Sequence, residues 1–140
     1  MSIEKRQKKI IDDFNFFDDW SCKYAYLISL GKALEPFPDD KKNDAFMVKG
    51  CQSQVWFDVT LIEGRLKFYA VSDSAIVSGL IGLLLKVYSG VTANEIIESN
   101  TDFMVEIDLA QHLSPTRNSG LHAMIHYIYT TAKRYVDVSA

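Results

Sequence analysis

The residues best suited to chemistry lie in one short stretch, residues 48–56, with the sequence VKGCQSQVW. Cys51 in this stretch has a glycine before it, small uncharged polar residues after it and a predicted strand beyond them. A cysteine kept for packing behaves as a small hydrophobe and favours apolar neighbours, which Cys51 lacks. A thiol on a loop that a rigid scaffold holds can meet a partner molecule. We therefore expect Cys51 to be the reactive residue.

Reaction at Cys51 requires the thiolate, and a free cysteine with a pKa of about 8.5 is mostly protonated at neutral pH. Lys49 lies two positions upstream and is one candidate for favouring the thiolate. Arg117 is the other, because a cation in the first turn of a predicted helix is unfavourable unless it serves an anion or a carbonyl. A purely structural role for Arg117 fits the sequence equally well. The second cysteine, Cys22, lies on a predicted helix, and we expect it to be structural or incidental.

The histidines offer two other kinds of site. His122 and His126 are spaced i, i+4 on one face of a predicted helix, which is a spacing that can bind zinc. Ala123 follows His122, so the glutamate of the metalloprotease motif is missing, and no nearby cysteine or carboxylate completes a ligand set. We therefore predict no metal site. His112 is the best candidate for a general base if Cys51 were a hydrolytic nucleophile, which requires the two side chains to meet.

The composition predicts one domain over residues 1–140 without nucleic-acid or membrane partners. The formal net charge is −3, and basic residues cluster only at 4–9, whereas nucleic-acid binding needs a basic patch. The longest apolar run, 75–85, is shorter than the roughly 20 residues of a membrane span, and no signal-peptide core precedes it. Two cysteines make neither a disulfide framework nor an iron–sulfur site. We expect a cytosolic protein.

Hydrophobic periodicity predicts five helices, which end near residues 13, 34, 90, 100 and 136. The third is apolar almost all round and should be central, and its Gly79 and Gly82 are expected to admit another backbone closely. Residues 103–112 are expected to be less regular. Each predicted helix follows a residue whose side chain can cap it: Ser2, Asp18 or Asp19, Ser72 or Asp73, Thr92, and Ser114.

Alternation with a period of two predicts a β-hairpin between the second and third helices. Its strands are expected over 55–62 and 65–71, joined by a tight turn at Glu63-Gly64. Residues 45–48 are predicted to add a third strand, because an isolated hairpin is marginal in water. The fold class is therefore α+β, with a small antiparallel sheet of about three strands packed on helices.

Residues 50–56, GCQSQVW, resemble the signature of the SufE family, the sulfur-acceptor partners of cysteine desulfurases. Residues 20–31 resemble the family pattern W-x-x-(R/K)-Y-x-x-L-I-x-L-G, and residues 72–80 resemble S-D-x-A-I-V-x-G-L. Residues 111–121 resemble Q-H-L-(S/T)-P-(S/T)-R-x-x-G-L. The matches run in register from about residue 20 to residue 126, which covers most of the chain.

The resemblance implies that Cys51 accepts sulfane sulfur from the persulfide of a pyridoxal-phosphate-dependent cysteine desulfurase. The protein would stimulate that enzyme and carry the sulfur to an iron–sulfur scaffold, acting as an accessory protein rather than an enzyme. It would bind no cofactor of its own, because a covalent persulfide on Cys51 is the expected intermediate. The implied fold is also that of U-type cluster scaffolds, but these carry several ligand cysteines. One cysteine in place favours a carrier.

The resemblance also implies how the thiol is presented. The thiol of family members lies beneath an apolar surface, and its loop moves outward on docking. Gly50 would supply flexibility, and Asp73 and Arg117 would shape the surroundings of the loop. The three residues after the cysteine can present the thiol without negative charge that would repel a persulfide: Gln52, Ser53 and Gln54. Cys22 is not part of the family pattern.

Two alternatives stay open at this point. One is a hydrolase or transferase that uses Cys51 with His112 as its base, and it requires a hydrogen bond between the two side chains. The other is a non-catalytic interaction domain whose cysteine loop only docks on a partner.

Overall fold

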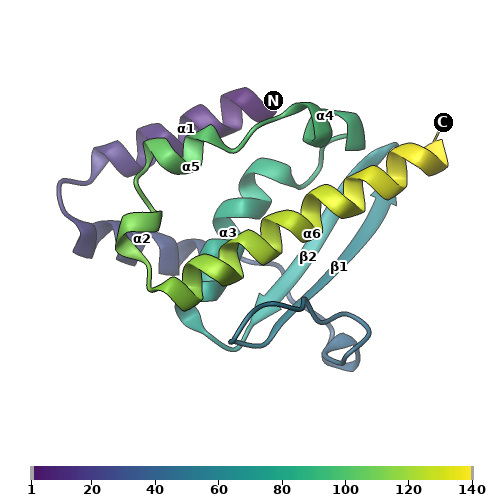
Figure 1. Ribbon diagram of the computed structural model, residues 1–140, viewed down its shortest axis with the longest axis horizontal. Helices are drawn as coiled ribbons and strands as arrows, with labels where there is room; N and C mark the ends of the chain where they lie inside the picture. Colours follow the sequence, from purple (N-terminus) through teal and green to yellow (C-terminus); the bar gives the residue numbers. More distant parts are fainter. Residues whose placement is uncertain (1, 140) are drawn as a thin grey trace.

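The computed structural model describes residues 2–139, and their side chains as far as residue 136. Figure 1 shows α6 running along the hairpin, with α1 and α5 side by side at the opposite edge of the molecule. This α+β arrangement of helices and an antiparallel sheet confirms the predicted fold class. The helices and strands are α1 (Ile3–Phe16), α2 (Trp20–Lys32), β1 (Val55–Ile62), β2 (Arg65–Ser72), α3 (Ala75–Tyr88), α4 (Ala93–Glu98), α5 (Asp102–Glu106) and α6 (Pro115–Ser139).

Side-chain caps begin the helices mostly where the sequence predicts them. Ser2 accepts a hydrogen bond from the N–H of Lys5, and Asp19 accepts one from the N–H of Cys22. The predicted cap of α3 at Ser72 or Asp73 was wrong, because Ser74 accepts the bond from Val77. Thr92 and Ser114 cap α4 and α6 as predicted. Residues 103–112, predicted to be less regular, contain most of the short helix α5 and a 3-10 turn, Ala110–His112.

The sheet has two strands in the described residues, so the predicted count of about three was too high. The strands pair from Val55 opposite Ser72 to Ile62 opposite Arg65. Glu63 and Gly64 both have positive φ angles, 52° and 80°, as a two-residue hairpin turn requires. The expected third strand makes one isolated bridge and two backbone hydrogen bonds with β1, because turns at residues 43–47 carry the chain away from a ladder.

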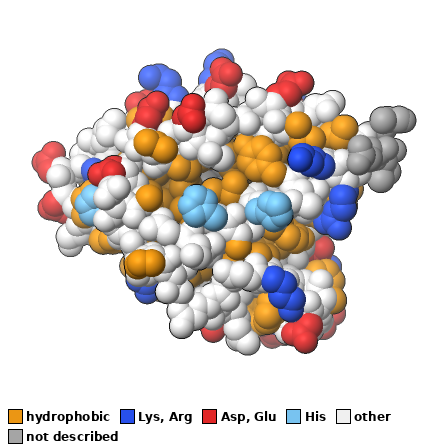
Figure 2. Space-filling view, in the orientation of Figure 1, with side chains coloured by type: hydrophobic (Ala, Val, Ile, Leu, Met, Phe, Trp, Pro, Cys, Tyr) orange, Lys and Arg blue, Asp and Glu red, His pale blue; other side chains and the backbone are white. Residues whose placement is uncertain are grey.

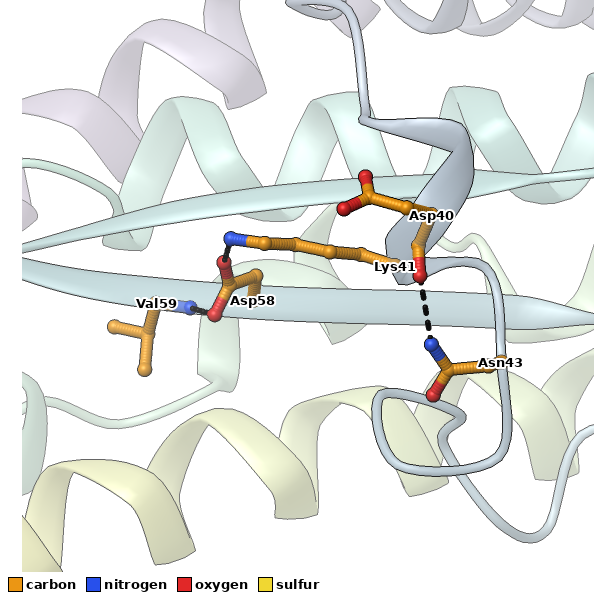
Figure 3. Close-up of polar contacts among 5 residues, drawn as sticks. All are labelled: Asp40, Lys41, Asn43, Asp58 and Val59. Atoms are coloured by element: carbon orange, nitrogen blue, oxygen red, sulfur yellow. Dashed lines mark hydrogen bonds and ion pairs between the residues drawn. The ribbon is translucent and has the colours of Figure 1, made fainter.

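The loop that precedes the cysteine stretch is tied to β1 by an ion pair. Figure 3 shows Lys41 reaching Asp58, with 2.7 Å between Nζ and Oδ2. The other oxygen of Asp58 accepts a bond from the N–H of Val59, and Asn43 donates to the carbonyl of Asp40. These contacts fix the path of the chain shortly before it reaches Cys51.

Helix α3 forms the centre of the core, as its apolar composition predicts, and it packs closely against α2. Leu80, Leu83 and Val87 of α3 are fully buried. A Cβ added at Gly82 would lie 2.6 Å from the carbonyl oxygen of Leu30, so only glycine permits this approach. Gly79 approaches the backbone of Leu27 in the same way. The two glycines therefore let the helix backbones meet, as expected.

The predictions about nucleic-acid and membrane partners can be compared with the charges on the surface and with the character of the helices. Figure 2 shows hydrophobic and histidine side chains along the middle of the viewed face, while charged side chains of both signs lie mostly at its margins. This face has no continuous basic patch among the described residues, and such a patch is what nucleic-acid binding requires. None of the helices in the described part of the chain combines the length and apolar character that a bilayer crossing requires.

Candidate functional site

Cys51 lines a cavity of about 500 Å³ between its own loop, the beginning of α3 and the first turns of α6. The first turn of α6 and the beginning of α3 lie at the same end of the molecule in Figure 1. The wall contains both polar and apolar residues. It is formed, besides Cys51, by Gln52, Ser53, Asp73, Ser114, Thr116 and Arg117, and by Val77, Leu80, Gly120 and Met124.

The loop that carries Cys51 is held at its two ends and is free between them. Val48 donates to the carbonyl of Val55 over 2.9 Å, which closes the loop at its base. The carboxylate of Asp73 accepts a bond of 3.2 Å from the N–H of Gln54. Residues 50–53 make no backbone hydrogen bond within the described part of the chain. Backbone with so few bonds opens at low free-energy cost, so this segment is suited to movement.

Gly50 begins the free part of the loop in a conformation that favours glycine. Its φ angle is +91°, and a Cβ added there would lie 3.2 Å from the Cβ of Ala123 on α6. The glycine therefore both turns the chain toward the cavity and allows the loop to lie against α6.

The Cys51 thiol is partly buried and points toward α6. Its Sγ donates a weak hydrogen bond of 3.6 Å to the carbonyl oxygen of Gly120. Burial raises the pKa of this thiol above its ordinary value, because the thiolate would lose its hydration. Burial is the cause of this shift, and the help expected from Lys49 or Arg117 stays a prediction. Burial in this arrangement therefore disfavours the thiolate, which is the nucleophilic form of the side chain.

The raised pKa leads to a test of the closed arrangement. In a Cys22→Ser background, where Cys51 is the sole thiol, the midpoint of alkylation rate against pH should lie above that of the same chain unfolded in urea. The unfolded chain loses its thiol proton first as pH rises, so the free energy of unfolding should fall through this range. Equal midpoints in the folded and unfolded chain would contradict the burial of the thiol.

Asp73 and Arg117 both line the Cys51 cavity, and they act differently there. Asp73 holds the end of the cysteine loop through the N–H of Gln54, and its own N–H donates to the carbonyl of Gln54 over 3.3 Å. The guanidinium of Arg117 forms no ion pair among the described residues, and its backbone N–H donates to the hydroxyl of Ser114. Arg117 is exposed, and no acidic side chain among the described residues neutralises its charge.

The contact between Asp73 and Gln54 supports a second prediction. Asp73→Ala removes the acceptor, and the cysteine loop should then open more often, so that Cys51 is alkylated several-fold faster at a fixed pH. An Asp73→Asn variant keeps an oxygen that can accept from Gln54 and serves as the matched control, with a rate close to that of the parent. Identical rates for the alanine and parent proteins would show that Asp73 does not restrain the loop.

His112 is not positioned to act as the base for Cys51. Its ring stacks on that of Trp20 with 3.8 Å between the centroids, and its Nδ1 lies 3.0 Å from the carbonyl oxygen of Asp108. Tyr24 donates its hydroxyl to the carbonyl of His112. Among the described residues, the Cys51 thiol hydrogen bonds only to Gly120. The Cys–His pair that a hydrolase requires is therefore not formed.

The remaining histidines and Cys22 lie away from the cysteine cavity. His122 and His126 are exposed, and Nε2 of His126 lies 3.4 Å from the hydroxyl of Thr130. The residues that the structure describes contain no group of three potential metal ligands. Cys22 is exposed in the first turn of α2, where its N–H donates to Asp19.

Several residues of the cavity wall were not predicted as site residues. Gly120 is the partner of the thiol, and Met124 completes the same face of α6. The spacing from Arg117 to Gly120 and on to Met124 places all three on one side of a helix. This spacing identifies the face once α6 is known to pack beside Cys51, which the sequence does not reveal. Val77 and Leu80 are likewise three residues apart on one side of α3, and they line the same cavity.

Two comparisons with known proteins bear on this site. The family model SufE, described as an Fe-S metabolism associated domain, matches residues 8–132. The solution structure of a hypothetical protein from Thermus thermophilus is similar, with a TM-score of 0.78 and 17% sequence identity. The similarity covers 94% of this chain and 96% of the other, and at this identity it shows the fold alone.

Proposed function

The chain belongs to the SufE family, whose domain is associated with Fe-S metabolism, and from this premise we propose that it carries sulfur for iron–sulfur cluster assembly. In this proposal Cys51 accepts persulfide sulfur from a cysteine desulfurase and delivers it to a scaffold. One observation carries the proposal. The Cys51 thiol lies on a loop with few backbone hydrogen bonds, and it lines a cavity between α3 and α6.

The transfer is a thiol exchange that needs no acid–base pair at Cys51. The Cys51 thiolate attacks the outer sulfur of the desulfurase persulfide, and a new sulfur–sulfur bond forms as the old one breaks. The desulfurase cysteine leaves as a thiolate with the electron pair, so the exchange consumes no oxidant or reductant. The isolation of Cys51 from His112 is compatible with this chemistry and unfavourable for a hydrolase.

The buried thiol requires that the loop open before it reacts. In the closed arrangement burial raises the pKa of Cys51, which lowers the fraction of thiolate. Moving residues 50–53 outward would restore hydration to the sulfur and bring its pKa toward that of an exposed cysteine. Docking on the desulfurase is the proposed trigger, since a partner that binds the open loop shifts the population toward it.

The proposed partners follow from this chemistry. The desulfurase supplies the pyridoxal phosphate and the reaction with cysteine, so the present chain acts as an accessory protein rather than an enzyme. An iron–sulfur scaffold receives the sulfur. We propose that the exchange occurs in the cytoplasm, where reducing conditions keep the thiols free.

The proposal is tested by the activity of a cysteine desulfurase in the presence of this chain. Alanine released from cysteine should rise with the concentration of the chain and then saturate, because Cys51 removes the sulfur that blocks the enzyme. The matched control is the same protein after alkylation of Cys51 in a Cys22→Ser background, and it should give no increase. Unchanged alanine release with the unmodified chain would contradict the proposal.

The remaining alternative is an interaction domain whose loop only docks. This alternative predicts the same increase in alanine release for the alkylated and unmodified proteins, provided that the alkyl group does not block docking. The carrier predicts an increase only with the free thiol. The carrier and the interaction domain therefore predict different results in this one experiment.

A further inference from the structure

The cavity beside Cys51 carries one acidic and one basic side chain that do not pair with each other. Asp73 and Arg117 both line it, and neither takes part in an ion pair among the described residues. Both side chains are exposed, so a small charged ligand that enters the cavity from solvent can reach each of them. The cavity volume of about 500 Å³ lies within the range of small-molecule sites, roughly 300–1,000 Å³.

We propose that this cavity binds a zwitterionic aminothiol acid, of which free cysteine is the smallest, as an acceptor of the sulfur on Cys51. The inference rests on the proposed function, because it assumes that Cys51 holds a persulfide. The α-ammonium group of the ligand faces Asp73, and its α-carboxylate faces Arg117. The hydroxyls of Ser114 and Thr116, which line the same cavity, offer further donors to the carboxylate.

The sulfur transfer balances without any further reactant. The ligand thiolate attacks the outer sulfur of the Cys51 persulfide, and a bond forms between these two sulfur atoms. The bond between the outer sulfur and Sγ breaks, and Sγ keeps its electron pair and leaves as a thiolate. The products are the Cys51 thiolate, which takes up a proton, and the persulfide of the ligand. No atom is lost, and no external oxidant or reductant takes part.

Holding the acceptor in the cavity matters because Cys51 is a poor leaving group. Burial raises the pKa of its thiol, and a thiol of higher pKa leaves more slowly. Thiols that arrive from solution without recognition should therefore react slowly with the persulfide. An acceptor that is oriented beside the sulfur gains the advantage of proximity. The site would thus select one acceptor among the small thiols of the cell.

The test uses the Cys22→Ser protein, loaded chemically with inorganic polysulfide and freed of excess reagent. Loss of the added sulfur from Cys51 is followed by intact mass after addition of L-cysteine, cysteamine, which lacks the carboxylate, or 3-mercaptopropionate, which lacks the ammonium group. Each rate is divided by the rate of the same thiol with the loaded chain unfolded in urea, which removes differences in intrinsic reactivity. L-cysteine should exceed each analogue by about threefold to fivefold, as expected for exposed charge contacts.

Two variants test which side chain contacts which charged group of the ligand. Arg117→Gln should remove the advantage of L-cysteine over cysteamine, and Asp73→Asn, which keeps an acceptor for Gln54, should remove its advantage over 3-mercaptopropionate. Lys49→Gln removes an exposed cation outside the cavity wall and should change neither ratio. Equal normalised rates for the three thiols, or ratios unaffected by Arg117→Gln and Asp73→Asn, would overturn the inference. Chemical loading bypasses the desulfurase, so failure of the desulfurase to load Cys51 would refute the carrier function separately.

Discussion

Replacing Cys51 with serine is expected to reduce stimulation of a cysteine desulfurase to background while leaving docking intact. The hydroxyl occupies nearly the same volume, so the loop and its bond to Asp73 should persist. It cannot form the thiolate that attacks a sulfur–sulfur bond. The measurement is alanine release at saturating Cys51→Ser protein, with binding to the desulfurase measured separately.

The control for this variant is the other cysteine of the chain. Cys22 is exposed on α2 and does not line the cavity, so Cys22→Ser should retain full stimulation. A Cys51→Ser protein that binds and still stimulates the enzyme would mean that docking alone produces the effect. The interaction-domain alternative would then be correct.

Introducing a methyl group at Gly82 is expected to destabilise the fold. Its Cβ would lie 2.6 Å from the carbonyl oxygen of Leu30, which is a backbone atom that cannot rotate aside. Overpacking of this kind costs about 1–3 kcal/mol, and it opposes the gain of about 1 kcal/mol from the better helix propensity of alanine. Because α2 would have to shift away from α3, we expect the cost to prevail. Urea unfolding of Gly82→Ala should show a net loss of up to about 2 kcal/mol in the free energy of unfolding.

Gly120 provides the matched control, since it is also a buried helical glycine. A Cβ added there would lie 3.6 Å from Sγ of Cys51, which is an ordinary contact distance. Gly120→Ala should therefore leave the free energy of unfolding unchanged or raise it by up to about 1 kcal/mol. Equal effects of the two substitutions would show that the close approach of α2 and α3 is not what requires Gly82.

The elements that the sequence predicts well are those whose signals are local. Ser2 and Thr92 cap their helices because a hydroxyl next to a periodic segment needs no tertiary partner. The hairpin follows from alternation and from the glycine of Glu63-Gly64, because Gly64 adopts the positive φ of its turn position without steric cost. Where two residues compete for one role, tertiary contacts decide. Asp73 is a good cap, but it holds Gln54, and Ser74 caps α3 instead.

The prediction of a third strand was wrong for a related reason. Residues 45–48 have suitable side chains, but turn bonds from Asn43 to Phe46 and from Asp44 to Met47 compete with a ladder. Such competition between local turns and strand pairing depends on where the loop is anchored. Here the anchor is the pair Lys41–Asp58, which involves residues far apart in the sequence.

The candidate site was predictable in its residue types but not in its electrostatics. Cys51 could be selected from its polar loop, and Asp73 and Arg117 lie around the same cavity, although their roles remain predictions. The burial that raises the pKa of Cys51 depends on the packing of α6 over the loop, which no local pattern encodes. For the same reason the sequence suggested help from Lys49 and Arg117, whereas the sulfur faces the carbonyl of Gly120.

The central claim is that Cys51 temporarily holds a sulfur atom, and intact mass after incubation with a cysteine desulfurase and cysteine tests it most directly. The account predicts a gain equal to one sulfur atom, located on the peptide that contains Cys51 and reversed by a reductant. A desulfurase that turns over while Cys51 gains no mass, or a gain confined to Cys22, would contradict it.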